Sequence, residues 1–350
     1  MRALKRAVIA ALKRAGYYER ALGALSGDRA LVLVYHRIVG TVGNREWRTG
    51  FERGVSASNF ERHMEFLRRR MRPVPLAELA DAVRRGRSLP ERTVCVTFDD
   101  GYRDNYTDAF PILRRHGIPA TVFVATAYME SGKAFWWDRV VHLVRNTPAK
   151  RVDLTGVVDL AGRRGSGAGA VVSLGGPRER AAAAERIVTA MEYLPPERIE
   201  SILGALRERL GVRDSGGNGA GETMSWSEIE HLSRSGIAIE SHTHSHPYLA
   251  PLSEKGVELE LRRSKECLEQ RIGGPVRGVA YPGGRRGMYT EATMRVAKRV
   301  GYDFGCVVDL AAVARGGNEF EIRRVPAEDS CDTMLAHKMV AALRRTARDG

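Results

Sequence analysis

An α/β fold built around a parallel, closed or nearly closed barrel is the fold class that the sequence predicts, and two observations carry this prediction. From residue 30 onward, short apolar runs of β type alternate with amphipathic helical stretches, which is typical of a parallel sheet covered by helices. Acidic and histidine side chains come directly after two of these runs. Because the chemistry of such barrels collects at the carboxyl ends of the strands, we expect these side chains to meet.

The β-type runs are the clearest elements, since they are short and rich in branched or aromatic residues. We predict strands over Ala30–Tyr35, Thr93–Phe98, Ala120–Ala125, Ile237–Glu240, Val276–Tyr281, Phe304–Val308 and Glu321–Val325. Apolar residues at helical spacing predict helices over Ser58–Arg70, Leu76–Arg85, Tyr106–His116, Ser227–Ser235, Ser253–Arg271 and Thr290–Val300. A single barrel domain over residues 29–350 contains all of them.

The chain before the barrel, residues 1–28, is expected to form a basic amphipathic helix. Its apolar side chains would share one side, formed by Leu4, Val8, Ile9 and Leu12. The uncharged apolar stretch between the basic residues is shorter than the roughly 7 to 15 residues of a secretory signal. Two interpretations stay open: the helix packs on the domain, or it attaches to an anionic membrane surface through residues 1–20.

The formal net charge of +14 favours a polyanionic partner. The basic residues are dispersed, however, and no nucleic-acid motif accompanies them, so we expect no specific nucleic-acid partner. An anionic membrane surface ranks above nucleic acid, and a merely solvated basic surface is an equal alternative. Since neither a convincing signal peptide nor an apolar run of about 18 residues is found, we expect a cytoplasmic location, peripheral at the inner membrane face.

Residues 132–222 interrupt the alternation and are expected to form an insertion that acts as a lid. Two helices are predicted within it, over Ala181–Tyr193 and Pro196–Leu210. Trp136 and Trp137 lie near its start and are candidates for stacking on sugar rings, although aromatic residues at such a junction also serve as packing.

The side chains that follow two strands predict a divalent metal site. Asp99 and Asp100 follow the strand over 93–98, and His242 and His246 follow the strand over 237–240. On a helical turn a spacing of four places both imidazoles on one side, and with Asp100 they form a three-ligand set that leaves positions open. We expect zinc, while cobalt, nickel or iron would also suit these ligands. His244 is the rival ligand if the segment is extended.

Two motifs then resemble a known family. Thr97-Phe-Asp-Asp-Gly101 and Ser241-His-Thr-His-Ser-His-Pro-Tyr-Leu249 are similar to the first two motifs of the polysaccharide deacetylases, the NodB-homology carbohydrate esterases of family 4. Ala280-Tyr-Pro-Gly-Gly284 resembles a form found in the branch of this family that deacetylates exopolysaccharides. The resemblance covers roughly residues 30–131 and 223–330. It implies a distorted (β/α)7 barrel and metal-dependent removal of an N-acetyl group from an amino sugar, in a polysaccharide or a lipid-linked glycan.

The resemblance also implies roles for single residues. Asp99 matches the general base of the family, and Asp100, His242 and His246 match its metal ligands. Gly283 stands where the family has a backbone N–H that stabilises the oxyanion. Near these motifs, two aromatic residues are expected to contact substrate, Tyr102 and Tyr281.

The sequence departs from the family pattern at two places. Ala280 stands where the third motif usually has an arginine, and Arg324 is our candidate to supply the missing charge, with a surface arginine as the alternative. The last motif normally places a histidine acid after a late apolar strand. Here Leu31-Val-Leu-Val-Tyr-His36 has that form near the start, as in branches with permuted motifs. His36 would then protonate the leaving group; the alternative is a core histidine at a strand end.

Other functions remain compatible with these residues. A related enzyme would remove a formyl or other acyl group from a lipid-linked amino sugar, and O-deacetylation is chemically easier than amide hydrolysis. A protein of another class would bind glycans on the same barrel without catalysis. Ala280 favours this binder slightly, whereas the intact set of two aspartates and two histidines argues against it.

Overall fold

The computed structural model describes residues 2–40, 54–160, 170–212 and 222–349, and side chains only for residues 7–346 within these ranges. The described residues form two compact units, each of which is presented by itself. The first unit contains the described residues up to 40, from 54 to 127 and from 224 onward. The second unit contains residues 128–223.

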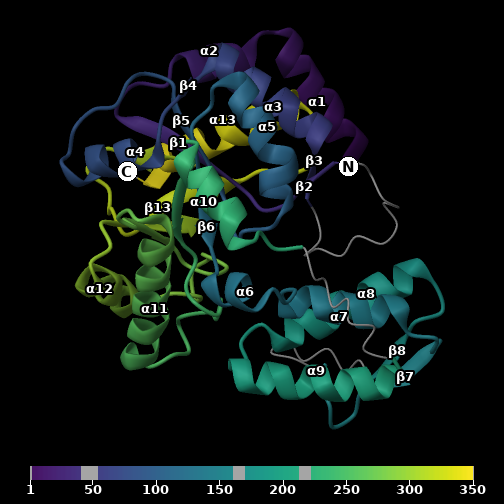
Figure 1. Ribbon diagram of the computed structural model, residues 1–350. Helices are drawn as coiled ribbons and strands as arrows, with labels where there is room; N and C mark the ends of the chain where they lie inside the picture. The colour runs from purple at the N-terminus through teal and green to yellow at the C-terminus, as the bar shows by residue number, and fades with distance from the viewer. Residues whose placement is uncertain (1, 41–53, 161–169, 213–221, 350) are drawn as a thin grey trace. The chain divides into compact units, whose positions relative to one another are not determined.

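The first unit is built on a closed barrel of seven parallel strands (Figure 1). In order around the barrel these are β1 (Arg29–Tyr35), β5 (Thr93–Phe98), β6 (Ala120–Val124), β9 (Ala238–Ser241), β10 (Gly278–Ala280), β11 (Phe304–Val308) and β13 (Ile322–Pro326). Closure comes from β1, which pairs in parallel with both β5 and β13. The predicted fold class is therefore confirmed, and each predicted strand corresponds to one of the seven.

Four shorter strands accompany the barrel. They are β2 (Ile38–Val39), β3 (Val55–Ser56), β4 (Arg72–Pro73) and β12 (Val313–Ala314). β2 pairs with β3, β4 extends the sheet beside β5, and β12 runs antiparallel to β1. The apolar barrel interior, including Val32, Cys95, Phe123 and Phe304, is inaccessible to solvent or nearly so.

Helices cover the outside of the barrel (Figure 1). They are α3 (Ala57–Arg70), α4 (Leu76–Arg84), α5 (Phe110–His116), α10 (Trp226–Arg234), α11 (Glu254–Ile272) and α12 (Glu291–Val300). Five of the six predicted helices match these within two residues. The sixth prediction, Tyr106–His116, is divided into a π-helical turn, η2 (Asn105–Ala109), and α5, because Pro111 has no N–H to continue an α-helical ladder.

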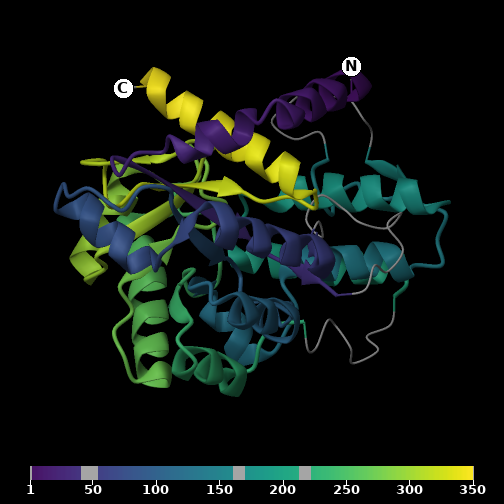
Figure 2. The same cartoon turned by 90° about the horizontal axis from the view of Figure 1, so that it is seen from above.

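The N-terminal segment forms two helices, α1 (Arg2–Arg14) and α2 (Tyr17–Gly23), where the sequence predicted one. Both pack against α13 (Asp332–Asp349), beside which they lie in Figure 2. Ile9 is buried in α1, but Val8, which was predicted on the same apolar side, is 51% exposed, so the prediction is wrong for Val8. Within the described part of the chain, no helix combines the length and apolar character needed to cross a bilayer.

The second unit is mainly helical. Its elements are α6 (Thr126–Ser131), which leads in from the first unit, α7 (Trp136–Asn146), α8 (Pro177–Met191), α9 (Pro196–Leu210) and the hairpin of β7 (Arg151–Asp153) and β8 (Val171–Ser173). α9 has the predicted bounds, and α8 begins four residues earlier than predicted because Pro177 suits the first turn of a helix. The sequence analysis did not predict α7 or the hairpin.

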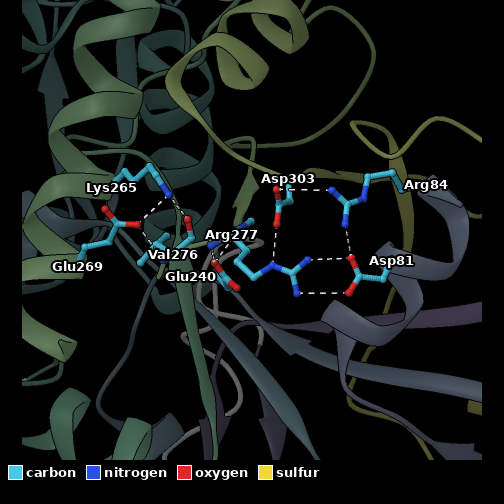
Figure 3. A network of polar contacts seen from close by, with 9 residues as sticks. Asp81, Arg84, Glu240, Lys265, Glu269, Val276, Arg277 and Asp303 are labelled. Atoms are coloured by element: carbon cyan, nitrogen blue, oxygen red, sulfur yellow. Dashed lines mark hydrogen bonds and ion pairs between the residues drawn. The ribbon is translucent and has the colours of Figure 1, made fainter. Parts of the chain in front are cut away.

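A network of charged side chains lies at the amino ends of β10 and β11 (Figure 3). Arg277, just before β10, donates to Asp81 of α4 at 2.8 Å and to Asp303, just before β11, at 2.6 Å. Arg84 of α4 also donates to Asp81, at 2.8 Å. These contacts fix α4 to the end of the barrel that is opposite the Asp and His motifs.

Glu240 of β9 lies beside this network and is 5% exposed. Its carboxyl group accepts from the N–H groups of Arg277 and Gly278, at 2.8 and 2.7 Å. Burial raises the pKa of Glu240 to about 8, since it outweighs these hydrogen bonds and the nearby positive charges. The folded state therefore holds a proton on Glu240 at neutral pH that the unfolded chain releases.

This difference predicts a pH-dependent stability. As pH rises from about 5 to about 8, the unfolded state gains the ionised Glu240 while the folded state does not, so wild-type protein should lose stability relative to Glu240→Gln. Above the folded-state pKa of Glu240, the difference in stability between the two proteins should stay constant. Urea titrations of both proteins between pH 5 and pH 9 measure it, and a difference that does not vary with pH would contradict the raised pKa.

Candidate metal centre

Asp99 and Asp100 continue β5 at the carboxyl end of the barrel. The Asp99 N–H extends the ladder by donating to the Tyr35 carbonyl at 3.0 Å. The backbone then turns, with φ of 76° at Asp100 and 88° at Gly101. Positive φ is uncommon for a residue with a side chain, so the turn at Asp100 is held by its surroundings. Both carboxylates are buried, with 2% of Asp99 and 5% of Asp100 exposed.

The histidine segment leaves β9 as a loop, and the helical turn predicted from the four-residue spacing is wrong. His242 remains attached to the barrel, since its N–H donates to the Val124 carbonyl at 2.9 Å. Thr243 and His246 then take positive φ, 67° and 61°. The two imidazoles converge because the backbone folds back on itself, and the sequence spacing alone does not reveal this geometry.

Glu260 of α11 fixes this loop from the side. Its carboxylate accepts from the N–H groups of His244 and Ser245, at 3.0 and 2.8 Å, and from the Ser245 hydroxyl at 2.6 Å. A glutamate inside a long amphipathic helix resembles any solvated helix position, so this role could not be predicted from the sequence.

Asp100, His242 and His246 form a cluster that can hold a metal ion. Asp100 Oδ1 lies 3.4 Å from His242 Nε2 and 3.3 Å from His246 Nε2. One possible ligand atom from each residue lies within 4.8 Å of the others. His242 Nδ1 bonds to the Ala280 carbonyl at 2.8 Å, which only accepts, so Nδ1 carries the proton and Nε2 offers its lone pair.

His244, the rival ligand, lies outside this cluster. Its Nδ1 bonds to the Thr126 hydroxyl at 2.8 Å, in a position where 8% of the residue is exposed. Two nitrogens and one carboxylate oxygen match an open, catalytic type of zinc site better than a closed structural one. The donor set therefore fits a divalent cation.

Asp99 is paired with Arg324, which reaches it from β13 inside the barrel. Nη1 and Nη2 of Arg324 donate to Oδ1 and Oδ2 of Asp99 at 2.6 and 2.7 Å, a bidentate ion pair. Arg324 is 0% exposed, so the alternative of a surface arginine is wrong. Its guanidinium also lies 5.2 Å from the centre of the Phe123 ring and donates to the Thr97 hydroxyl.

These neighbours set the charge of both carboxyl groups. Burial raises the pKa of Asp99, but the charge of Arg324 leads a set of interactions that hold it below its usual value. Burial likewise raises the pKa of Asp100, and the interactions with His242, His246 and His36 outweigh this, leaving the pKa well below its usual range. Both side chains are therefore ionised at neutral pH.

His36 and Gly283 complete the carboxyl end of the barrel. His36 directly follows β1, is exposed, and its charge contributes to lowering the pKa of Asp99 and Asp100, so it lies within electrostatic reach of both. Gly283 follows β10 with φ of 70°. A Cβ there would lie 2.5 Å from Met288 Sδ, so only glycine fits without displacement.

The four aromatic residues predicted to contact substrate are all buried, with Tyr102 and Tyr281 at 1% and 0% exposure. Tyr281 donates to the Phe320 carbonyl at 3.2 Å. In the second unit, Trp136 and Trp137 are 8% exposed, and the Trp137 ring stacks on Phe135. Packing is the role that these contacts display, and contact with substrate stays a prediction.

A family model for polysaccharide deacetylases matches residues 86–150 and 193–305, slightly more than half of the chain. This match contains Asp99, Asp100, His242, His246 and Gly283, but neither His36 nor Arg324. YxkH of Bacillus subtilis (strain 168) is 21% identical over 295 residues, which are 84% of this chain and 70% of that protein. A poly-β-1,6-N-acetyl-D-glucosamine N-deacetylase of Escherichia coli (strain K12) is 50% identical over 48 residues, 14% of this chain and 7% of that protein.

Solved structures share the fold. The deacetylase PplD of Streptococcus pyogenes, solved in complex with acetate, aligns with a TM-score of 0.58 over 89% of this chain and 98% of that one, at 17% identity. IcaB of Ammonifex degensii aligns with a TM-score of 0.54 over 90% of this chain and 98% of that one, at 21% identity.

The cluster predicts which histidines bind metal. His242→Ala and His246→Ala should each lower zinc affinity by about a hundredfold or more, because each removes one of three ligands. His244→Ala is the matched control from the same loop and should retain zinc binding. Competition against a fluorescent zinc chelator measures the affinities; equal losses in His244→Ala and His246→Ala would contradict the ligand assignment.

The buried ion pair predicts a coupled effect on folding stability. Arg324→Met leaves Asp99 charged and buried without a partner, and should lower the free energy of unfolding by about 3 to 5 kcal/mol. Adding Asp99→Asn should restore part of this loss, because no buried charge then remains. Urea titrations at pH 7, where Asp99 is ionised in the wild type, measure Arg324→Met, Asp99→Asn and the double variant. If the loss of stability in the double variant equals the sum of the losses in the two single variants, Arg324 and Asp99 are not directly paired.

Proposed function

The chain belongs to the polysaccharide deacetylase family, a family of hydrolases that remove N-acetyl groups, and we propose that it hydrolyses the N-acetyl amide of an amino sugar within a glycan. One observation carries this proposal. An ionised, buried Asp99 lies next to the cluster of Asp100, His242 and His246 at the carboxyl end of the barrel. We further propose zinc as the cation.

An amide makes two demands on these residues. Its carbonyl is a poor electrophile and its nitrogen leaves poorly unless protonated, so a strong nucleophile and a proton donor are both needed. Asp100, His242 and His246 would hold a divalent cation, which would lower the pKa of a bound water to about 7 and polarise the acetyl carbonyl.

Asp99 accepts a proton from the water that attacks the acetyl carbon. Arg324 keeps Asp99 ionised and fixes the orientation of its carboxylate through the bidentate pair. The N–H of Gly283 donates to the carbonyl oxygen as negative charge develops there. His36 donates a proton to the sugar nitrogen as the C–N bond breaks, which leaves acetate and a free amine.

A polymer of N-acetylglucosamine is the first substrate to test. Support comes from the 48-residue segment that is 50% identical to a poly-β-1,6-N-acetyl-D-glucosamine N-deacetylase. We also propose a lipid-linked glycan as an alternative substrate, and a cytoplasmic location at an anionic membrane surface. Residues 132–222 are proposed to form a lid. The aromatic residues proposed to contact substrate are Tyr102, Tyr281, Trp136 and Trp137.

The experiment is acetate release from a panel of N-acetylated glycans, with Asp99→Asn as the test variant. We expect wild-type activity on at least one N-acetylglucosamine polymer, abolished by chelation and restored by zinc. Asp99→Asn should lower kcat by about 10² to 10⁴, the usual range for loss of a general base, while zinc affinity is retained. Full activity of this variant would show that another group takes the proton, and no acetate from any glycan would disprove the proposed reaction.

A further inference from the structure

Two side chains on the segment after the Asp motif hold the backbone around His36. Asn105 Nδ2 donates to the His36 carbonyl at 2.7 Å. Asp104 Oδ1 accepts from the Ile38 N–H at 3.0 Å, and Asp104 Oδ2 accepts from Arg37 Nε at 3.1 Å. Asp104 and Asn105, which are adjacent in the sequence, thereby hold three consecutive residues, His36 to Ile38.

This attachment matters because the barrel no longer holds the chain at His36. β1 ends at Tyr35, so the ladder hydrogen bonds that restrain the strand stop one residue earlier. Beyond Tyr35, the contacts from Asp104 and Asn105 restrain the chain together with the pairing of β2 and β3, in which the Val55 N–H donates to the Arg37 carbonyl at 2.8 Å. The His36 ring itself is exposed, so contacts of the ring with a packed core do not restrain it in the way they restrain His242.

Asn105 keeps its place despite an unfavourable environment. The residue is 2% exposed, and its Oδ1 finds no hydrogen-bond partner among the residues that the structure describes. A buried acceptor without a partner costs about 1 to 3 kcal/mol. An apolar side chain of similar size would avoid this penalty, but it would also remove the donor to His36. The hydrogen bond to the His36 carbonyl is therefore a physical reason for an amide side chain at this position.

The local helix geometry places Asn105 at this point. Asn105 begins the π-helical turn η2, closed by the hydrogen bond from the Phe110 N–H to the Asn105 carbonyl. Such wide turns often occur at functional sites, because one extra residue re-aims the side chains before it. The segment that follows Asp99 and Asp100 therefore reaches across to His36, the residue that we propose as the proton donor.

We propose that Asn105 and Asp104 are positioning residues that aim His36 at the leaving nitrogen of the substrate. This inference deepens the proposed function and rests on it. Their action is indirect: both bind the backbone or side chains of residues 36–38, and neither touches the reacting atoms.

The test separates proton donation from the other steps by changing the leaving group. An aryl acetate ester such as 4-nitrophenyl acetate releases a stable phenolate that needs no proton, whereas the N-acetyl amide needs one. Asn105→Ala should lower kcat for an N-acetylglucosamine oligomer about tenfold or more, since small misplacements of reacting groups have effects of this size. Its kcat for the ester should stay within about twofold of wild type, and its zinc affinity and KM should not change.

Two further variants make the result decisive. Thr107→Ala is the matched control: its exposed hydroxyl lies on the same π-helical turn but bonds to Arg103 and Asp108, so both activities should remain. The double variant His36→Ala with Asn105→Ala should be no slower on the amide than His36→Ala alone, because Asn105 acts through His36.

Equal losses on amide and ester, or losses that add in the double variant, would overturn the positioning role. Failure of the proposed function has a different signature, namely wild-type protein that releases no acetate from any glycan. Hydrogen exchange of the Ile38 amide then decides the positioning role by itself: it should be faster in Asp104→Ala, which removes the acceptor of this N–H, than in Thr107→Ala, and equal rates would overturn the inference.

Discussion

The bidentate pair between Asp99 and Arg324 is the interaction on which the site depends. Burying either charge alone would be costly, and the pair is acceptable only because each donor and each acceptor is matched inside the barrel. The pair also decides the chemistry, since it leaves Asp99 ionised and unable to rotate. The neighbouring Asp100 is then available to the two histidines, so adjacent carboxylates of identical type acquire different tasks from their different partners.

Local backbone strain supports this division. Outside glycine, the described residues with positive φ are Arg92, Asp100, Thr243 and His246, and three of these four lie in the metal cluster or its loop. Each such backbone conformation is higher in energy than the extended conformation of the same residue in a regular strand. The strain is held by many ordinary contacts, such as those of Glu260 with the histidine loop, and it brings ligands from two strands to one point.

Much of this structure could be predicted from the sequence. Thr93–Phe98 and Phe304–Val308 were predicted to the residue, because buried parallel strands are continuous apolar runs with few other interpretations. The pairing of Asp100 with His242 and His246 followed from their positions after such strands. The loop geometry did not, because positive φ at Thr243 and His246 depends on tertiary contacts. Glu260 and Asn105 were missed for the same reason: their partners are backbone groups, which leave no mark in the sequence.

Barrel closure has a consequence for how the chain reaches this state. The strands that close the barrel are the first and the last, and they pair Leu33 with Val325, about 290 residues apart in the chain. Contacts of such high sequence separation form late and slowly during folding. A nascent chain therefore exposes its half-built barrel until β13 arrives, and Asp99 has no counter-charge until then. The ion pair of Asp99, and with it the complete site, can therefore form only after β13 has been synthesised.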